Sequence, residues 1–144
     1  MSRTTFGYPA RRSQGFDFNR LGLLVAVLEK RIGLQLETED IFVNVVGGIK
    51  AEDPAADLSV ITAVASAFLG KQALFDAVIL GEVGLAGEVR SISQAVLRIN
   101  EAEKLGFKKC ILPKSNCQNL EYNKNKIEII PVLTVKETLG IVLS

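Results

Sequence analysis

The sequence predicts a single α+β domain over residues 1–144, with helices packed on a mixed β-sheet. Segments with helical apolar spacing alternate with short apolar runs along the chain, and no internal repeat interrupts them. The chain has 144 residues, of which 48% are hydrophobic and 23% charged, so it is long enough to bury a core without disulfides or metal. No apolar run approaches the ~20 residues of a membrane helix, and the basic N-terminus lacks the apolar centre of a secretory signal. We therefore expect a cytoplasmic protein with no membrane partner.

Each element follows from local spacing. The segments expected to be helical are 18–32, 56–69, 93–107 and 134–143. The segments expected to be strands are 40–47, 77–83, 87–92, 108–113 and 126–132, with a short turn or helix at 115–120. Asp17 or Asn19 can cap the first helix and Gly33 can end it, while Gly47, Gly48 and Pro54 bracket a loop. The second helix is nearly all apolar, so we expect it to be buried between layers.

Several kinds of site are excluded by residue type and spacing. The chain has no histidine, and Cys110 and Cys117 are seven residues apart, so we expect reduced thiols without a zinc or CxxC redox site. The run 81–89, "GEVGLAGEV", has glycines three apart and precedes a strand, which predicts a hairpin in place of a dinucleotide site. The run 69–72, "LGKQ", lacks the upstream glycine and the Ser or Thr of a phosphate-binding loop.

The stretch 52–60, "EDPAADLSV", is typical of a strand-to-helix corner that presents a nucleophile. A helix N-terminus offers amide N–H groups and a favourable dipole to a developing anion. The position where a nucleophile would stand is Ala55, which carries only a methyl group. Without histidine, Ser–Lys chemistry is the main nucleophilic option left to the chain.

Three segments resemble the proteolytic domain of Lon-type peptidases in their order: "VNVVGGIKAEDPAADLSV", "GEVGLAGEVRSI" and "EAEKLGFKKCILPKSN". The resemblance implies the fold of that domain, which is similar to domain 2 of a small ribosomal protein. It also places the family's catalytic serine on Ala55, its flanking glycines on Asp53 and Asp57, and its catalytic lysine on Arg98. Alanine cannot attack a carbonyl, and arginine cannot serve as a neutral base. The resemblance therefore implies an inactive relative.

Two alternatives concern this corner. A displaced Ser–Lys pair could use Ser59 or Ser66 with Lys50, although Ser59 lies a full turn beyond the corner, and helix serines with a surface lysine are the simpler interpretation. Asp53 or Asp57 can favour the helix dipole and accept amide hydrogen bonds. Arg98 either pairs with one of these carboxylates or faces solvent on an amphipathic helix.

A narrower family, the RadA (Sms) DNA repair proteins, resembles nearly the whole chain. The resemblance is carried by "TTFGYPARRSQGFDFNRLGLLVAVLEKRIGL", "VNVVGGIKAEDPAADL" and "GEVGLAGEV". It implies the C-terminal Lon-like domain of a hexameric, DNA-dependent ATPase that assists branch migration in recombination. Residues 1–17 would be a basic linker from a missing ATPase core. No cofactor is expected in this domain, because ATP, magnesium and zinc would belong to the missing parts.

The resemblance also implies partners: single-stranded or branched DNA, other copies in a hexameric ring, and a recombinase. Charge supports a nucleic-acid contact at the front of the chain, where residues 1–31 hold six basic against two acidic side chains. The candidate DNA-binding residues are Arg11, Arg12, Arg20, Lys30, Arg31 and Arg90. Residues 7–15 form a Gly- and Pro-bounded loop in this interpretation, which would expose Arg11 and Arg12.

Only Tyr8 and Phe16 interleave with these arginines in sequence, so we expect contacts to the nucleic-acid backbone without base readout. Two alternatives to DNA binding stay open at this point. The same arginines could dock the domain on its motor or on a neighbouring subunit. The domain could also be a protein-interaction module without a nucleic-acid role.

Overall fold

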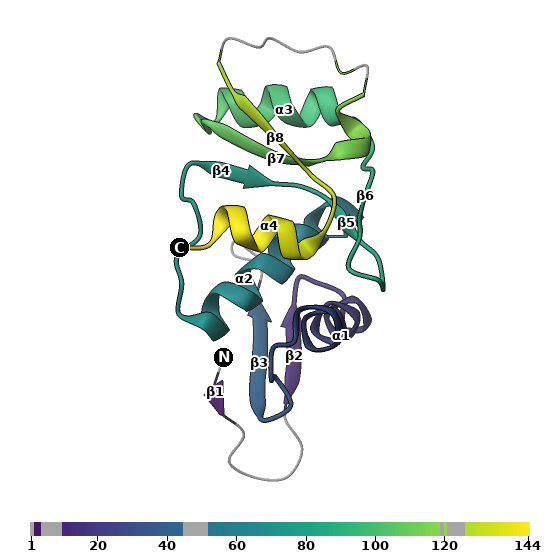
Figure 1. Ribbon diagram of the computed structural model, residues 1–144, viewed down its shortest axis with the longest axis vertical. Helices are drawn as coiled ribbons and strands as arrows, with labels where there is room; N and C mark the ends of the chain where they lie inside the picture. The colour runs from purple at the N-terminus through teal and green to yellow at the C-terminus, as the bar shows by residue number, and fades with distance from the viewer. Residues whose placement is uncertain (1, 4–9, 45–51, 119, 121–125) are drawn as a thin grey trace.

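The computed structural model describes residues 2–3, 10–44, 52–118, 120 and 126–144 (Figure 1). The elements are, in order, β1 (Ser2–Arg3), β2 (Arg11–Gln14), α1 (Phe18–Val27), η1 (Leu28–Ile32), β3 (Glu39–Asn44), η3 (Pro54–Ala56), α2 (Asp57–Leu69), β4 (Ala77–Ile79), β5 (Glu82–Val83), β6 (Val89–Arg90), α3 (Ala95–Lys104), β7 (Lys109–Pro113), η4 (Lys114–Asn116), β8 (Glu128–Val132) and α4 (Val135–Val142). The mixed helix and strand class is confirmed. None of the helices in the described ranges is long and apolar enough to cross a membrane.

Within the described residues, the strands form three small sheets instead of the one sheet that was expected. The first has the order β1-β3-β2 and is mixed, because β1 runs antiparallel and β2 parallel to β3. The second, β4-β7-β8, is parallel, and the third is the β5–β6 hairpin. Figure 1 shows α3 on one face of β4-β7-β8, with α2 and α4 between the opposite face and the first sheet.

Strand β7 separates two hydrophobic clusters. Its side chains alternate, with Cys110 and Leu112 directed toward α3 and Ile111 toward α2 and α4. The outer cluster, under α3, consists of Ala55, Ile92, Ile99, Ala102, Cys110, Leu112 and Ile127. The main cluster is larger and joins α1, α2, α4, β3 and the hairpin. Since β7 is buried on both faces, it reads as a continuous apolar run, as the sequence predicted.

Helix boundaries agree with the signals read from the sequence. The Asp17 side chain accepts a hydrogen bond from the Asn19 amide at the start of α1. Gly33 ends the following π-helical turn, η1, with a φ of 85° that favours glycine. Helix α2 is less enclosed than expected, because Leu58, Ile61 and Ala65 are buried while the opposite side of the helix is exposed.

Two strand predictions need correction. The loop expected at residues 7–15 contains strand β2, which pairs in parallel with β3. Arg11 lies opposite Ile41 at one end of the pairing, and Gln14 lies opposite Asn44 at the other. The strand expected at 77–83 is broken at Gly81, whose amide donates to Ala55 O and whose carbonyl accepts from Leu58 N, both at 3.0 Å. Gly81 therefore joins the start of α2 to the hairpin. The predicted hairpin turn around Gly84 and Gly87 is confirmed.

Candidate functional site

The residues 53–57, here called the α2 corner, form a closed turn at the start of helix α2. The Asp53 carboxylate accepts the Ala55 amide at 3.0 Å, and the Asp53 carbonyl accepts the Ala56 amide at 3.0 Å. Ala55 is only 2% exposed, and its methyl group belongs to the outer cluster. The amides that a nucleophilic corner would offer to an anion are thus already bonded within the corner.

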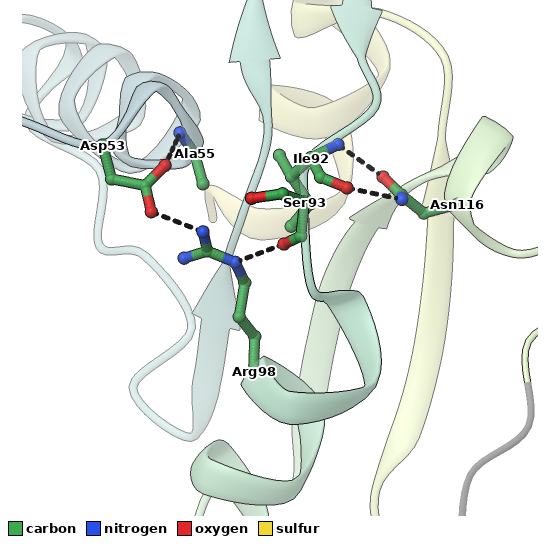
Figure 2. Close-up of polar contacts among 6 residues, drawn as sticks. All are labelled: Asp53, Ala55, Ile92, Ser93, Arg98 and Asn116. Atoms are coloured by element: carbon green, nitrogen blue, oxygen red, sulfur yellow. Dashed lines mark hydrogen bonds and ion pairs between the residues drawn. The ribbon is translucent and has the colours of Figure 1, made fainter.

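Arg98 comes from helix α3 and closes the corner from the other side (Figure 2). Its Nη2 forms an ion pair with Asp53 Oδ2, and its Nε donates to the Ser93 carbonyl at 2.7 Å. Of the two alternatives for Arg98, the structure shows pairing with a corner carboxylate in place of a solvent-facing side chain, and the partner is Asp53. The Ala55 amide, and secondly the Arg98 guanidinium, hold the pKa of Asp53 below its ordinary value.

Residues 91–93, beside Arg98, are held in place by residues that the sequence analysis did not identify. Asn116 brackets Ile92, accepting its amide at 2.8 Å and donating to its carbonyl at 2.9 Å (Figure 2). The hydroxyls of Ser91 and Ser115 lie 2.5 Å apart. No local signal links these pairs, because they join the segment after β6 to η4 across 24 residues. A hollow of about 200 Å³ lies at the corner, lined by Asp53, Pro54, Ala55, Glu82, Ser91, Ile92 and Ser93.

The serines proposed for a displaced dyad are engaged elsewhere. Ser59 Oγ donates to the Ile79 carbonyl, and Ser66 Oγ donates to the Lys71 carbonyl at 2.5 Å. Both bonds are made by the hydroxyl hydrogen, which a general base would have to remove. Lys50, Gly47 and Gly48 lie outside the described residues.

The second carboxylate of the corner, Asp57, is fully buried and pairs with Arg20. Arg20 Nε donates to Asp57 Oδ1 at 2.9 Å and its Nη2 pairs with Oδ2, so the contact is bidentate. The Val83 amide also donates to Oδ2, at 3.1 Å. The hydrogen bond to Asp57 raises the pKa of Arg20 above its ordinary value. These bonds tie α1 and the hairpin to the first turn of α2.

The arginines predicted to bind DNA therefore have different environments. Arg11 is half-buried: its guanidinium donates to the Glu39 carbonyl and, at 2.8 Å, to the Leu36 carbonyl, and lies 4.0 Å from Glu29. The expected exposure of Arg11 is thus wrong, because its side chain donates to carbonyls at and just before the start of β3. Arg20 is likewise engaged with Asp57. Both have structural partners that the sequence did not reveal.

The other four candidates are exposed, but they lie on different elements. Arg12 is on β2, Lys30 and Arg31 are on η1, and Arg90 is on β6. Arg90 Nη2 lies 3.6 Å from the Glu88 carboxylate. The stem of Arg31 packs against the hairpin at Gly87, where an added Cβ would meet it at 3.5 Å. The fold brings Arg31 to the hairpin that carries Arg90, whereas Arg12 stands on a separate sheet.

The two cysteines, which the sequence predicts to be reduced thiols, have free side chains. Cys110 is buried in the outer cluster and Cys117 is partly buried, and neither forms a disulfide. Burial raises the pKa of Cys110 to about 12 and also raises the pKa of Cys117. Both are therefore protonated and unreactive at neutral pH.

The fold brings Arg98 to the α2 corner, where it pairs with Asp53. Comparison with known families decides the assignment. The profile of the Lon protease (S16) C-terminal proteolytic domain matches residues 27–144. The chain belongs to this family. Ala55, in the α2 corner, and Arg98 occupy the two positions that the resemblance equates with the catalytic serine and lysine.

Relatives among characterised proteins are DNA repair proteins named RadA. The chain is 44% identical over 143 residues to RadA of Halalkalibacterium halodurans, 45% over 139 residues to that of Bacillus subtilis, and 47% over 133 residues to that of Aquifex aeolicus. These alignments cover 99%, 96% and 92% of this chain but only 31%, 30% and 29% of the relatives. The chain thus matches the C-terminal region of RadA and spans about a third of its length.

Proposed function

We propose that this Lon-type domain is a non-catalytic part of a RadA-type DNA repair and recombination ATPase, in which it supports ring assembly and binds DNA. The observation that carries the proposal is the α2 corner. Ala55 supplies no nucleophile, and Arg98 is bound to Asp53. An arginine keeps its proton at any physiological pH, so it cannot activate a serine or water.

The surroundings of the corner also support a non-catalytic role. Its amides are bonded to Asp53, and the nearby Ser59 hydroxyl donates to a backbone carbonyl. A peptidase that used these residues would have to break the Asp53–Arg98 pair, free the amides and supply a base. The Lon fold is retained here without its chemistry, which is a common separation of fold from function.

The partners in this proposal are single-stranded or branched DNA, further copies in a hexameric ring, and a recombinase. The site of action is the cytoplasm. ATP and magnesium serve the motor of the whole protein, and zinc serves its N-terminal part. The names of the relatives, together with the exposed cations Arg12, Lys30, Arg31 and Arg90, support DNA contact.

The catalytic half of the proposal is tested by incubating the chain with unfolded casein and a serine-directed phosphonate. We expect no cleavage and no labelled serine. The Ala55→Ser and Arg98→Lys double variant is the matched control, because it restores both residue types of the dyad. Specific labelling of Ser59 or Ser66 in the unmodified chain would reject the non-catalytic assignment.

The binding half is tested by fluorescence anisotropy at several salt concentrations. Replacing Lys30 and Arg31 together by alanine should weaken DNA binding and reduce the salt slope by about 1.4 units on single strands, if each cation neutralises one phosphate. The matched control is Lys136→Ala, a basic residue on α4. If the slope is unchanged but assembly is lost in sedimentation, these residues dock a subunit instead of DNA.

A further inference from the structure

The outward face of strands β2 and β3 carries an aromatic ring beside a cation. The parallel register pairs Arg12 with Phe42 and Gln14 with Asn44. Residues paired across adjacent strands lie on the same side of the sheet, and the side alternates along each strand. The burial pattern follows this alternation: Ile41 is buried, whereas the side chains of Arg12, Gln14, Phe42 and Asn44 are exposed. We call these four residues the β2–β3 face.

Nothing in the part of the chain that the structure describes accounts for the exposure of Phe42. Its side chain is 57% exposed, although it lies in the middle of a strand whose inward neighbours enter the core. Within the described ranges, Arg12 forms no ion pair, unlike Arg11, Arg20, Arg90 and Arg98. Asp40, the preceding outward residue on β3, accepts a hydrogen bond from the Ala10 amide at 2.8 Å.

A hollow of about 320 Å³ lies between β3 and α2. Its lining includes Phe42 and Asn44 as well as residues directed toward the core, Ile41, Val43 and Val64. This volume is at the lower end of the range for small-molecule sites, about 300–1,000 Å³. On the β2–β3 face itself, Phe42 has the Arg12 guanidinium as its cross-strand neighbour and two side-chain amides next to it along the strands.

We propose that the β2–β3 face is a stacking surface for single-stranded nucleic acid, with an unpaired base on Phe42 and a phosphate on Arg12. This inference rests on the proposed DNA-binding function and names its site and substrate. An exposed aromatic ring binds any base through its π-face, while a nearby arginine neutralises the backbone. Bases in a duplex are stacked on one another and cannot reach a ring on a sheet, so the face selects single strands.

The residues beside the ring favour nucleic acid over a protein partner. The buried core of a protein interface is largely apolar, whereas Phe42 is the single apolar residue among the four of the β2–β3 face, beside one cation and two side-chain amides. Amide side chains can donate to and accept from base edges. The expectation of backbone contact alone was drawn from Tyr8 and Phe16. Phe16 is buried, and Tyr8 lies outside the described residues. Phe42 is 30 positions after Arg12 in the chain and lies beside it in the sheet.

The absence of tryptophan from the sequence permits a direct test. The Phe42→Trp variant places one fluorophore on the face, and Phe75→Trp is the matched control, because Phe75 is 95% exposed in the loop before β4. The probes are an oligothymidylate of about 15 nucleotides, which is near the upper site size of a single stacking domain, and a hairpin duplex. We expect the oligothymidylate to quench Phe42→Trp but not Phe75→Trp, and the duplex to quench neither.

Affinity measurements complete the test. Phe42→Leu keeps an apolar side chain but loses the ring, and it should weaken oligothymidylate binding roughly 5- to 150-fold, the equivalent of one stacked base. Phe42→Tyr should bind as the unmodified chain does. Arg12→Ala should lower the salt slope by about 0.7 units, as expected for one phosphate on a single strand.

Three outcomes would overturn the inference, and they separate it from the proposed function. If the chain binds DNA but Phe42→Leu binds equally well, DNA binding stands and the stacking surface does not. If neither probe binds, both proposals fail. If Phe42→Leu changes the sedimentation of the chain and leaves oligothymidylate affinity unchanged, the face is a contact between copies.

Discussion

The α2 corner holds two aspartates, four residues apart, that each pair with an arginine from a different helix. Asp57 has a side-chain exposure of 0% and its partner Arg20 one of 30%, whereas Asp53 has an exposure of 50% and Arg98 one of 23%. Asp57 accepts three hydrogen bonds, two from Arg20 and one from Val83. The Asp53 carboxylate accepts one bond from the Ala55 amide of its own turn and one from Arg98.

The difference shows that one kind of contact serves two purposes within a single turn. A buried carboxylate requires its partners, because an unpaired charge in the interior is costly. A half-exposed pair gains little free energy, because water solvates both groups when they separate. The Arg20–Asp57 pair is thus a condition of folding. The Arg98–Asp53 pair mainly determines what occupies the corner.

The largest expected effect is on the buried pair. Arg20→Ala leaves the Asp57 carboxylate buried without its cation, and it should lower the free energy of unfolding by about 3 kcal/mol. Urea unfolding followed by circular dichroism measures this value. Arg12→Ala is the control, because it removes an exposed arginine and should change stability by less than about 0.5 kcal/mol. Equal losses in the two variants would contradict the distinction between the pairs.

An intermediate effect is expected at Asp53, which also caps the turn at the start of α2. Asp53→Ala removes the cap and the ion pair, so we expect a loss of about 1 kcal/mol. Asp53→Asn keeps a capping oxygen and loses only the charge, and it should cost a few tenths of a kcal/mol. The same urea titration separates the two variants. If Asp53→Asn lost more than half of what Asp53→Ala loses, the ion pair would outweigh the cap.

A smaller effect is expected when the arginine of the exposed pair is removed. Arg98→Ala should lower the unfolding free energy by at most about 1 kcal/mol, because Asp53 is half-exposed and becomes solvated. Comparison with Arg20→Ala under identical conditions gives the ratio between the two pairs. A loss as large as that in Arg20→Ala would show that Arg98 has a structural role that its contacts do not suggest.

The smallest effect concerns pH. The folded pKa of Asp53 is below its ordinary value of 3.8, so its contribution to stability is present above that value and is lost as the pH falls through the lowered pKa. Carboxyl NMR titration should find this pKa below 3.8. In Arg98→Ala it should rise only in part, because the Ala55 amide is the larger cause. A complete return to 3.8 would assign the shift to Arg98 alone.

Local features of this chain were predictable because their causes lie within a few residues. The Asp17 cap, the Gly33 terminus and the corner at Ala55 each depend on neighbouring positions. Strand β2 was missed because "RRSQ" has no apolar residue. Its inward side chain, Arg11, bonds to the Glu39 carbonyl at the start of β3 and to the Leu36 carbonyl just before it. A polar residue on the inward side removes the alternation that identifies a strand.

The site was predictable in part for the same reason. Ala55 and Arg98 were found from the family resemblance, and the Asp53 partner was one of two candidates. The engagement of Arg20 with Asp57, and the adjacency of Arg12 and Phe42, depend on contacts 37 and 30 residues apart in the chain. Spacing along the sequence does not encode such contacts. Charge alone therefore grouped six cations that the fold separates into bound and exposed ones.

The division of the interior by strand β7 has a consequence for how the protein opens. The outer cluster contains seven buried residues, far fewer than the main cluster on the other face of the strand. Helix α3 rests on the smaller cluster and is held to the rest by Arg98 and by the bonds of Asn116 at Ile92. Regions with few buried contacts unfold locally before the whole domain does. The amide hydrogens of α3 should therefore exchange with solvent before those of α2, with the α2 corner at the boundary between the two parts that unfold separately.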